Sequence, residues 1–202
     1  MKRIFAQFSL VLALIIVSTT CVLAKGDPSV KDLMGEWATI GTHSCVQANV
    51  GGFGAPPNFQ LLTDGSSRVT QEAGTLSLFG DGTGSWSGKA VQINYNANTA
   101  NSYPVMGYTT DCDVAYQTMQ DGTIQFQFDN CISTFTAGYY GPETQGGKYH
   151  FTAEYAQLSA DGVTMVIWDL EPRLERIWVT TGDTTTDYNR ICSRTGTAIK
   201  FR

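Results

Sequence analysis

Four Asp-Gly pairs constrain the fold of this 202-residue chain more than any other feature of its sequence. Glycine adopts a positive φ without steric cost and aspartate bonds the nearby backbone, so the pair favours a tight hairpin turn. Each pair lies between segments rich in β-branched and aromatic residues, and no window shows a helical period. The pattern predicts an all-β, antiparallel protein built largely from consecutive hairpins. The pairs are Asp64-Gly65, Asp81-Gly82, Asp121-Gly122 and Asp161-Gly162.

The first 24 residues have the pattern of a secretory signal peptide. Lys2 and Arg3 precede an apolar run over residues 8–17, and Ala24 provides a small residue at the expected cleavage site. The run is shorter than the roughly 20 residues of a transmembrane helix. An alternative is a lipid anchor on Cys21, although the residues before it are a poor lipoprotein box.

These features predict a protein exported to the periplasm or the extracellular space, with no transmembrane segment. We expect an exposed N-terminal arm over residues 25–34 and one barrel domain over residues 35–202. Without the leader the chain has 11 basic and 18 acidic side chains, a net charge of −7. Nucleic acids and anionic membranes attract basic surfaces, so the composition argues against both as partners. The sequence indicates no cofactor and leaves the oligomeric state open.

Four cysteines remain after the leader, and an even number in an exported protein indicates disulfides. Cys112 and Cys131 lie symmetrically about Asp121-Gly122, so folding of that hairpin brings them within bridging range. Cys45 and Cys192 then remain, near the two ends of the mature chain. A bridge between them would join the first and last strands. A metal site is the alternative, but no Cys-x-x-Cys spacing supports it.

Closure of the sheet into a barrel removes the unpaired edge strands that a meander otherwise exposes. The short spacing of the strands and the bridge between the first and last strands favour an up-and-down barrel of about eight to ten strands over a sandwich. In antiparallel register, Ala38 and Ile40 should lie near Ile199 and Thr197, with all four facing one side.

The tripeptide Gly35-Glu36-Trp37 resembles the Gly-x-Trp signature of lipocalins, at the start of the first predicted strand. The turn sequences over residues 79–84 and 158–162 resemble those of bacterial lipocalin-like barrels of the calycin type. The resemblance implies an up-and-down barrel with a ligand cavity. It also implies an arginine near the end of the chain, Arg190 or Arg194, that packs on Trp37.

An aromatic-lined cavity would suit a small apolar or aromatic ligand, because aromatic rings offer large contact areas and tyrosine adds a polar group. We therefore predict a non-catalytic, ligand-binding barrel. Tyr139 and Tyr140 belong to a glycine-rich loop over residues 137–147, where they would cover the barrel mouth or stack on sugar rings. The ligand-binding candidates are Trp37, Tyr116, Phe126, Tyr139, Tyr140, Glu154, Tyr155 and Trp168.

Two alternatives to ligand binding remain. With a three-residue loop over 160–162, Glu154 and Trp168 should face each other across the fourth hairpin, and an outward Glu154 is the favoured interpretation. An inward Glu154, or His150, could instead move protons in an isomerase or cyclase. His43 and His150 are expected on strand surfaces or a cavity wall. The third hypothesis is a cell-surface or extracellular interaction module that uses its loops.

Overall fold

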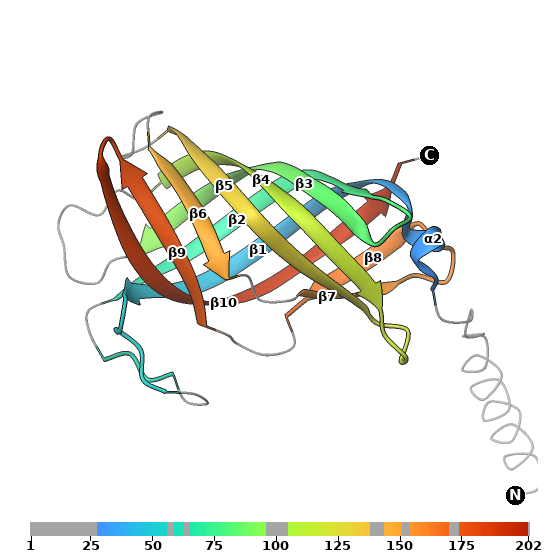
Figure 1. Ribbon diagram of the computed structural model, residues 1–202, viewed down its shortest axis with the longest axis horizontal. Helices are drawn as coiled ribbons and strands as arrows, with labels where there is room; N and C mark the ends of the chain where they lie inside the picture. The colour runs from blue at the N-terminus through green and yellow to red at the C-terminus, as the bar shows by residue number, and fades with distance from the viewer. Residues whose placement is uncertain are drawn as a thin grey trace, which may run out of the picture.

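The computed structural model shows a closed antiparallel β-barrel with a short helix at one end (Figure 1). It describes residues 28–55, 59–62, 65–95, 105–137, 144–150, 154–169 and 174–201, and for residues 148–150 the backbone only. The elements are α2 (Val30–Leu33), β1 (Gly35–Asn49), β2 (Gly65–Leu78), β3 (Thr83–Tyr95), β4 (Val105–Thr118), β5 (Ile124–Ala137), β6 (Gln145–His150), β7 (Glu154–Leu158), β8 (Thr164–Trp168), β9 (Leu174–Thr181) and β10 (Thr184–Lys200).

The ten strands form eight positions around the barrel wall. Strands β1 to β5 and β10 each fill one position. The sixth position is shared by β6 and β7, which both pair with β5, and the seventh by β8 and β9, which both pair with β10. The barrel closes where β1 pairs with β10, from Trp37 opposite Lys200 to Asn49 opposite Tyr188. The predicted up-and-down barrel is therefore confirmed.

Three of the four Asp-Gly pairs form the tight turns that the sequence predicts. Gly82, Gly122 and Gly162 have φ values of 86°, 78° and 73°, in the region that favours glycine. In each turn the aspartate Oδ1 accepts a hydrogen bond from the backbone N–H two residues later, at 2.9 Å for Asp81, 2.9 Å for Asp121 and 3.1 Å for Asp161. These bonds stabilise the turns locally.

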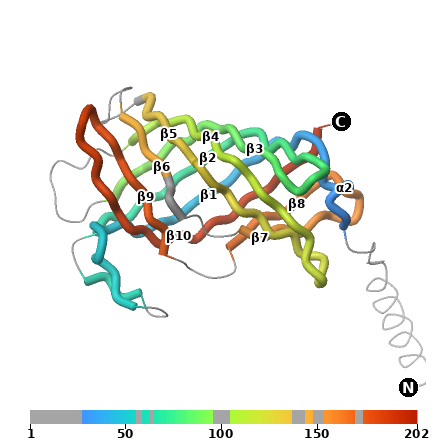
Figure 2. Tube along the Cα trace, viewed as in Figure 1, coloured from blue at the N-terminus to red at the C-terminus, as the bar shows by residue number. Residues whose placement is uncertain are grey.

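The first Asp-Gly pair does not make a hairpin. Gly65 is the first residue of β2, and β2 pairs with β1 across the long connection over residues 50–64 rather than with residues 59–62. Within the described part of that connection, a single bridge joins Phe53 to Leu61. We call the connection the β1–β2 loop. It lies at the end of the barrel opposite α2 (Figure 2).

Both predicted disulfides are present. Cys45 bonds Cys192 across the closing β1–β10 pair, at a sequence separation of 147, and Cys112 bonds Cys131 between β4 and β5, at a separation of 19. The predicted register next to the first bridge is also confirmed, because Ala38 lies opposite Ile199 and Ile40 opposite Thr197. The first bridge thus fastens the seam along which the cylinder closes.

The α2 end of the barrel is filled by an apolar core. Leu33 of α2 is fully buried there, so the expectation of an exposed arm over residues 25–34 is wrong for this residue. The indole Nε1 of Trp37 donates a hydrogen bond to the Leu33 carbonyl at 2.9 Å. Lys200 Nζ lies 5.2 Å from the centroid of the Trp37 ring. The cation on this tryptophan is therefore Lys200, and the expectation of Arg190 or Arg194 is wrong.

The predicted loop over residues 137–147 is shorter in the structure. Strand β5 extends to Ala137 and β6 begins at Gln145, so Gly146 and Gly147 belong to the barrel wall. In the pairing of β6 with β9, Gly147 lies opposite Trp178, and a Cβ on Gly147 would lie 2.4 Å from the Trp178 ring. A side chain at this position would clash, which explains why glycine occupies a strand here.

We predict that removing the seam disulfide destabilises the barrel more than removing the hairpin disulfide. Loop-closure entropy assigns about 5 kcal/mol to a crosslink over more than 100 residues and about 3 kcal/mol to one over fewer than 20. Urea unfolding of Cys45→Ser/Cys192→Ser and of Cys112→Ser/Cys131→Ser measures both losses. Equal losses, or a larger loss in the second variant, would show that the seam disulfide does not stabilise the barrel more than the hairpin disulfide does.

Candidate functional site

The half of the interior away from α2 is polar. Strand residues alternate between the two faces of the barrel wall, so every second residue of β1, β2, β9 and β10 points inward. At these positions the chain places charged and amide side chains instead of aliphatic ones. The buried polar residues are His43, Gln47, Thr70, Gln92, Thr110, Thr144, Glu154, Glu175 and Arg194.

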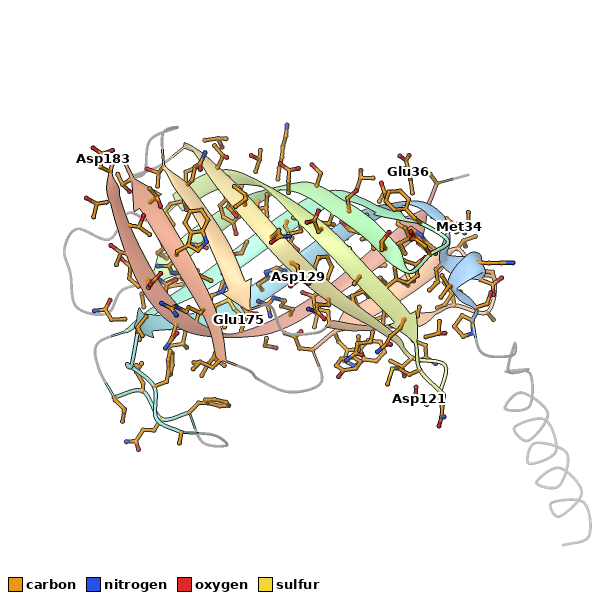
Figure 3. All side chains as sticks on the ribbon, viewed as in Figure 1. Met34, Glu36, Asp121, Asp129, Glu175 and Asp183 are labelled. Carbon is orange, nitrogen blue, oxygen red and sulfur yellow. A yellow bond between two sulfur atoms is a disulfide. The ribbon has the colours of Figure 1, made fainter. Side chains whose placement is uncertain are left out.

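Arg194 of β10 is the centre of a buried ion cluster. Its Nη1 lies 3.2 Å from Asp169 Oδ2 and its Nε lies 3.4 Å from Glu154 Oε1, while its Nη2 donates to Glu175. The second carboxylate oxygen of Glu175 accepts a hydrogen bond from Arg190 Nε at 2.7 Å. In Figure 3, Glu175 lies along the middle of the barrel, away from both ends. One guanidinium thus joins the sixth, seventh and eighth positions of the wall.

Burial and charge act in opposite directions on this cluster. Burial by itself lowers the pKa of Arg194, but the carboxylates of Glu175, Glu154 and Asp169 outweigh it, so the pKa is raised and the guanidinium stays charged. Burial raises the pKa of Asp169, and Arg194 offsets only part of that shift. Folding therefore disfavours the charged form of Asp169.

A second pair lies next to the cluster, on β1 and β2. His43 is opposite Arg194 in the β1–β10 pair, and its Nε2 is 2.9 Å from Glu72 Oε1 of β2. Near them, burial raises the pKa of Tyr108, and the charge of Glu72 raises it further. A hydrogen bond with Thr70 and the charges of Arg190 and Arg68 act against this shift. The interior therefore contains basic and acidic groups in nearly equal number.

A cavity of about 100 Å³ lies between these groups. Part of its wall has no side chains, because Gly41 and Gly196 line it and lie opposite each other in the β1–β10 pair. Trp86, Tyr108, Phe128 and Phe135 form aromatic parts of its wall, together with the charged groups described above. Pockets that enclose drug-sized ligands occupy about 300–1,000 Å³. This cavity holds several water molecules or a molecule of a few heavy atoms.

Arg190 lines the cavity, and Gln47 lies opposite it in the β1–β10 pair. Arg190 Nη2 and Gln47 Oε1 are both buried and have no hydrogen-bond partner among the described residues. One is a donor and the other an acceptor. Water, or a small molecule with both kinds of group, would satisfy them.

The ligand-binding residues predicted from the sequence do not lie together in the structure. Trp37, Tyr116 and Phe126 are buried in the apolar core at the α2 end, outside the cavity wall. Tyr155 and Trp168 lie opposite each other in the β7–β8 pair, on the outer face of the barrel. Tyr139, Tyr140 and the side chain of His150 lie outside the described residues. Of the candidates, Glu154 alone lines the cavity within the described part of the chain.

The predicted facing of Glu154 and Trp168 is wrong by one residue of register. The last paired residues of the hairpin are Leu158 and Met165, one position away from the pairing that a three-residue loop would give. Because strand side chains alternate, this shift leaves Trp168 outside and turns Glu154 inward. The favoured outward interpretation of Glu154 is therefore also wrong, whereas His43 does line the cavity.

The sequence did contain a signal for Arg194 and Arg190. Both are an even number of residues from Cys192, so alternation places all three side chains on one face, and the bridge to Cys45 is buried on the inner face. Alternation then predicts two inward arginines, and buried arginines require carboxylate partners. Glu72 and Glu175 carried no comparable signal, because their orientation depends on the pairing of distant strands.

Among the described residues, no group of three or more His, Cys, Asp and Glu side chains is placed to hold a metal ion. No helix in the described ranges is long and apolar enough to cross a membrane. No protein-family model matches the sequence, and no curated protein matches it either.

Among solved structures, the fold is similar to the crystal structure of Neisserial surface protein A (NspA). The TM-score is 0.52 and the sequence identity 8%, over 83% of this chain and 97% of that chain. Similarity at this identity shows the fold alone. The lipocalin resemblance of the sequence receives no support beyond the barrel itself.

We predict that Arg194→Met costs about 3–5 kcal/mol of stability, because it removes the cation shared by three buried carboxylates, of which Glu175 keeps Arg190. Arg176→Met is the matched control. Arg176 pairs with Asp187 at 2.7 Å on the outer wall, where an exposed pair contributes about 1 kcal/mol or less. Urea unfolding measures both changes. Equal costs would show that the cluster does not hold the wall together.

Asp169→Asn should behave in the opposite way. The raised pKa of Asp169 means that its charge opposes folding at neutral pH and that this penalty disappears as the pH falls through its folded-state pKa. We expect the variant to be at least as stable as the wild type at pH 7, with any advantage shrinking towards pH 4. Unfolding curves at the two pH values test this, and a large loss at pH 7 would contradict it.

Proposed function

We propose that this protein is an exported, cell-surface or extracellular interaction module that acts through its outer wall and loops. The barrel serves as a rigid scaffold rather than as a container. The fold similarity to a protein named as a surface protein supports this hypothesis, as do two disulfides, which persist in oxidising compartments. The proposal includes cleavage of a signal peptide after Ala24.

The observation that carries the proposal is the interior. The α2 half is a packed apolar core, and the other half is occupied by side chains that pair with one another. The remaining cavity of about 100 Å³ is smaller than a pocket for an ordinary apolar or aromatic ligand. A barrel of eight positions has room for side chains or for one small ligand, and here side chains take most of the room.

The composition of the outer wall supports the proposal that the barrel is surrounded by water and not by lipid. A barrel that crosses a lipid bilayer needs an outward apolar band about 25 Å tall. Asp111 and Asp113 lie exposed in the middle of β4, and Asp129 lies opposite Asp113 on β5. Gln117 and Gln127 are exposed on the same part of the wall. Carboxylates at this height would oppose insertion.

The end of the barrel opposite α2 supports binding by loops. In the β1–β2 loop, Leu62 is 59% exposed and Leu61 42% exposed. Large apolar side chains on a projecting loop are common where a protein contacts a partner. The turn between β9 and β10 lies at the same end, marked by Asp183 in Figure 3.

A second candidate function is the binding of a very small polar ligand in the cavity. The unpartnered Arg190 Nη2 and Gln47 Oε1 favour it, because both atoms are buried and Arg190 lines the cavity. The isomerase or cyclase alternative receives less support. Its base, Glu154, lies 3.4 Å from Arg194 in the ion cluster.

Gly41 allows the two functions to be separated. It lines the cavity, and a Cβ there would meet Thr195 O at 3.4 Å and Glu72 Cγ at 3.6 Å, which are ordinary contacts. We expect Gly41→Val to fill part of the cavity and leave cosedimentation of the exported protein with cell envelopes of its host unchanged. Leu61→Asp/Leu62→Asp should weaken that cosedimentation at least tenfold.

The opposite pattern would contradict the proposal. If Gly41→Val abolished cosedimentation while the loop variant retained it, the interior would carry the function. Wild-type protein that failed to cosediment under any condition would remove the surface assignment. Native mass spectrometry of host-purified protein adds an independent check, because the proposal expects no bound organic ligand.

A further inference from the structure

Between Glu36 at one end and Asp187 at the other, the outer wall over the closing seam carries no charged side chain. Strand alternation places every second residue of β1 from Ala38 to Ala48, of β2 from Ser67 to Ser77 and of β10 from Asn189 to Ile199 on the outside. All of these positions hold aliphatic, hydroxyl or amide side chains. We call this surface the seam face. It covers three neighbouring positions of the wall for most of their length.

Large apolar side chains are exposed on the seam face. Ile40 is 66% exposed and Ile199 56% exposed. Ile40 lies opposite Thr197, which in turn lies opposite Val166 of β8, itself 55% exposed, so the apolar surface is continuous across three strands. On the other side, Val91 of β3 extends it. Apolar surface of this continuity is characteristic of an interaction site.

The seam face shares one feature with the centre of protein–protein interfaces, which is the depletion of charged residues. Overall apolar content does not distinguish such interfaces from the rest of a surface. The opposite part of the wall shows the contrast, with Asp111, Asp113 and Asp129 on β4 and β5. Charge is therefore absent from one side of the barrel and concentrated on the other.

We propose that the seam face is a docking surface for a second copy of this chain. Without the leader the chain has a net charge of −7, so two copies repel each other wherever their charged surfaces meet. The seam face is the surface on which this repulsion is smallest. A basic partner would instead be attracted to the acidic wall over β4 and β5.

The size of the seam face fits a weak, reversible dimer. Three strands about 4.8 Å apart and about 11 residues long at about 3.3 Å per residue cover roughly 500 Å². Stable interfaces bury about 800 Å² on each partner, and transient ones less. Two such faces pack about 10 Å apart with their strands within about 30° of each other. A face of this size belongs to the transient class, for which we expect dissociation in the micromolar range.

The inference rests on the proposal that the outer wall carries the function. It is tested by sedimentation equilibrium of the exported protein between roughly 1 and 500 μM, a range set by the expected affinity. Thr42 lies exposed at the centre of the seam face, opposite Thr195 and Gln71. We expect Thr42→Glu to raise the dissociation constant at least tenfold, because each dimer would bury two like charges.

Thr136→Glu is the matched control. Thr136 is exposed on β5, four positions around the wall from β1, so the substitution adds the same charge far from the seam face. This variant should dimerise like the wild type. If Thr42→Glu unfolds, Thr195→Glu tests the same surface from β10.

Three results would overturn the inference. The first is a wild type that stays monomeric at every concentration, including one that floats with phosphatidylcholine vesicles instead of dimerising. The second is unchanged dimerisation of both seam variants. The third is equal loss of dimerisation in Thr42→Glu and Thr136→Glu. If a monomeric wild type still cosedimented with cell envelopes, the dimer proposal would be contradicted and the proposed function would not.

Discussion

The pairing of β1 with β10 is the constraint on which the rest of the structure depends. It turns a meander into a cylinder, and a cylinder gives every strand an inner and an outer face with no unpaired edge. The Cys45–Cys192 disulfide lies within this pairing and links residues 147 positions apart. Once the seam is closed, alternation alone decides which side chains meet inside.

Closure divides the interior into two halves of different chemistry. At the α2 end, Trp37 and its neighbours form a dry core, with Leu33 as a plug and Lys200 above the indole. In the other half, Arg194 joins carboxylates from the sixth and seventh positions, where the wall is built from strand pairs rather than single long strands. Buried ion pairs of this kind add little net stability but are costly to break. We interpret the cluster as a fastener that fixes how β7, β8 and β9 dock on β10.

This division leaves little free volume inside the barrel. Most of the interior is filled by side chains that pair with one another, so the surface available for contacts with other molecules is the outer one. There the wall is asymmetric, acidic over β4 and β5 and uncharged over the seam. In the function proposed above, the acidic wall would remain in water and the uncharged wall would contact the partner.

Local sequence signals predicted the turns and disulfides of the barrel but not the residues that meet in its polar interior. The Asp-Gly turns at Gly82, Gly122 and Gly162 depend on two adjacent residues, and the hairpin disulfide depends on the symmetry of one turn, so both were readable from the sequence. The orientation of Glu154 depended on whether one hairpin loop held three residues or four. That difference costs little energy locally and is decided by tertiary packing, yet it moves every side chain to the other face.

The prediction of a hairpin turn at Asp64-Gly65 was wrong for a similar reason. Its Asp-Gly pair is a sound local turn signal, but the long β1–β2 pairing offers far more hydrogen bonds than a short hairpin over residues 59–71. The partners of Arg194 could not be predicted because they come from strands that meet it only after closure. Contacts of high sequence separation leave no local trace.

Hydrogen exchange of the β1 backbone amides tests barrel closure most directly. If β1 is held between β2 and β10, the amides over residues 39–47 should exchange only through global unfolding, at rates equal to those of the central strand β3. If the seam is open, the amides of β1 that point away from β2 would exchange like those of an edge strand, many orders of magnitude faster. That result would contradict the closed cylinder and, with it, the enclosed ion cluster and the seam face.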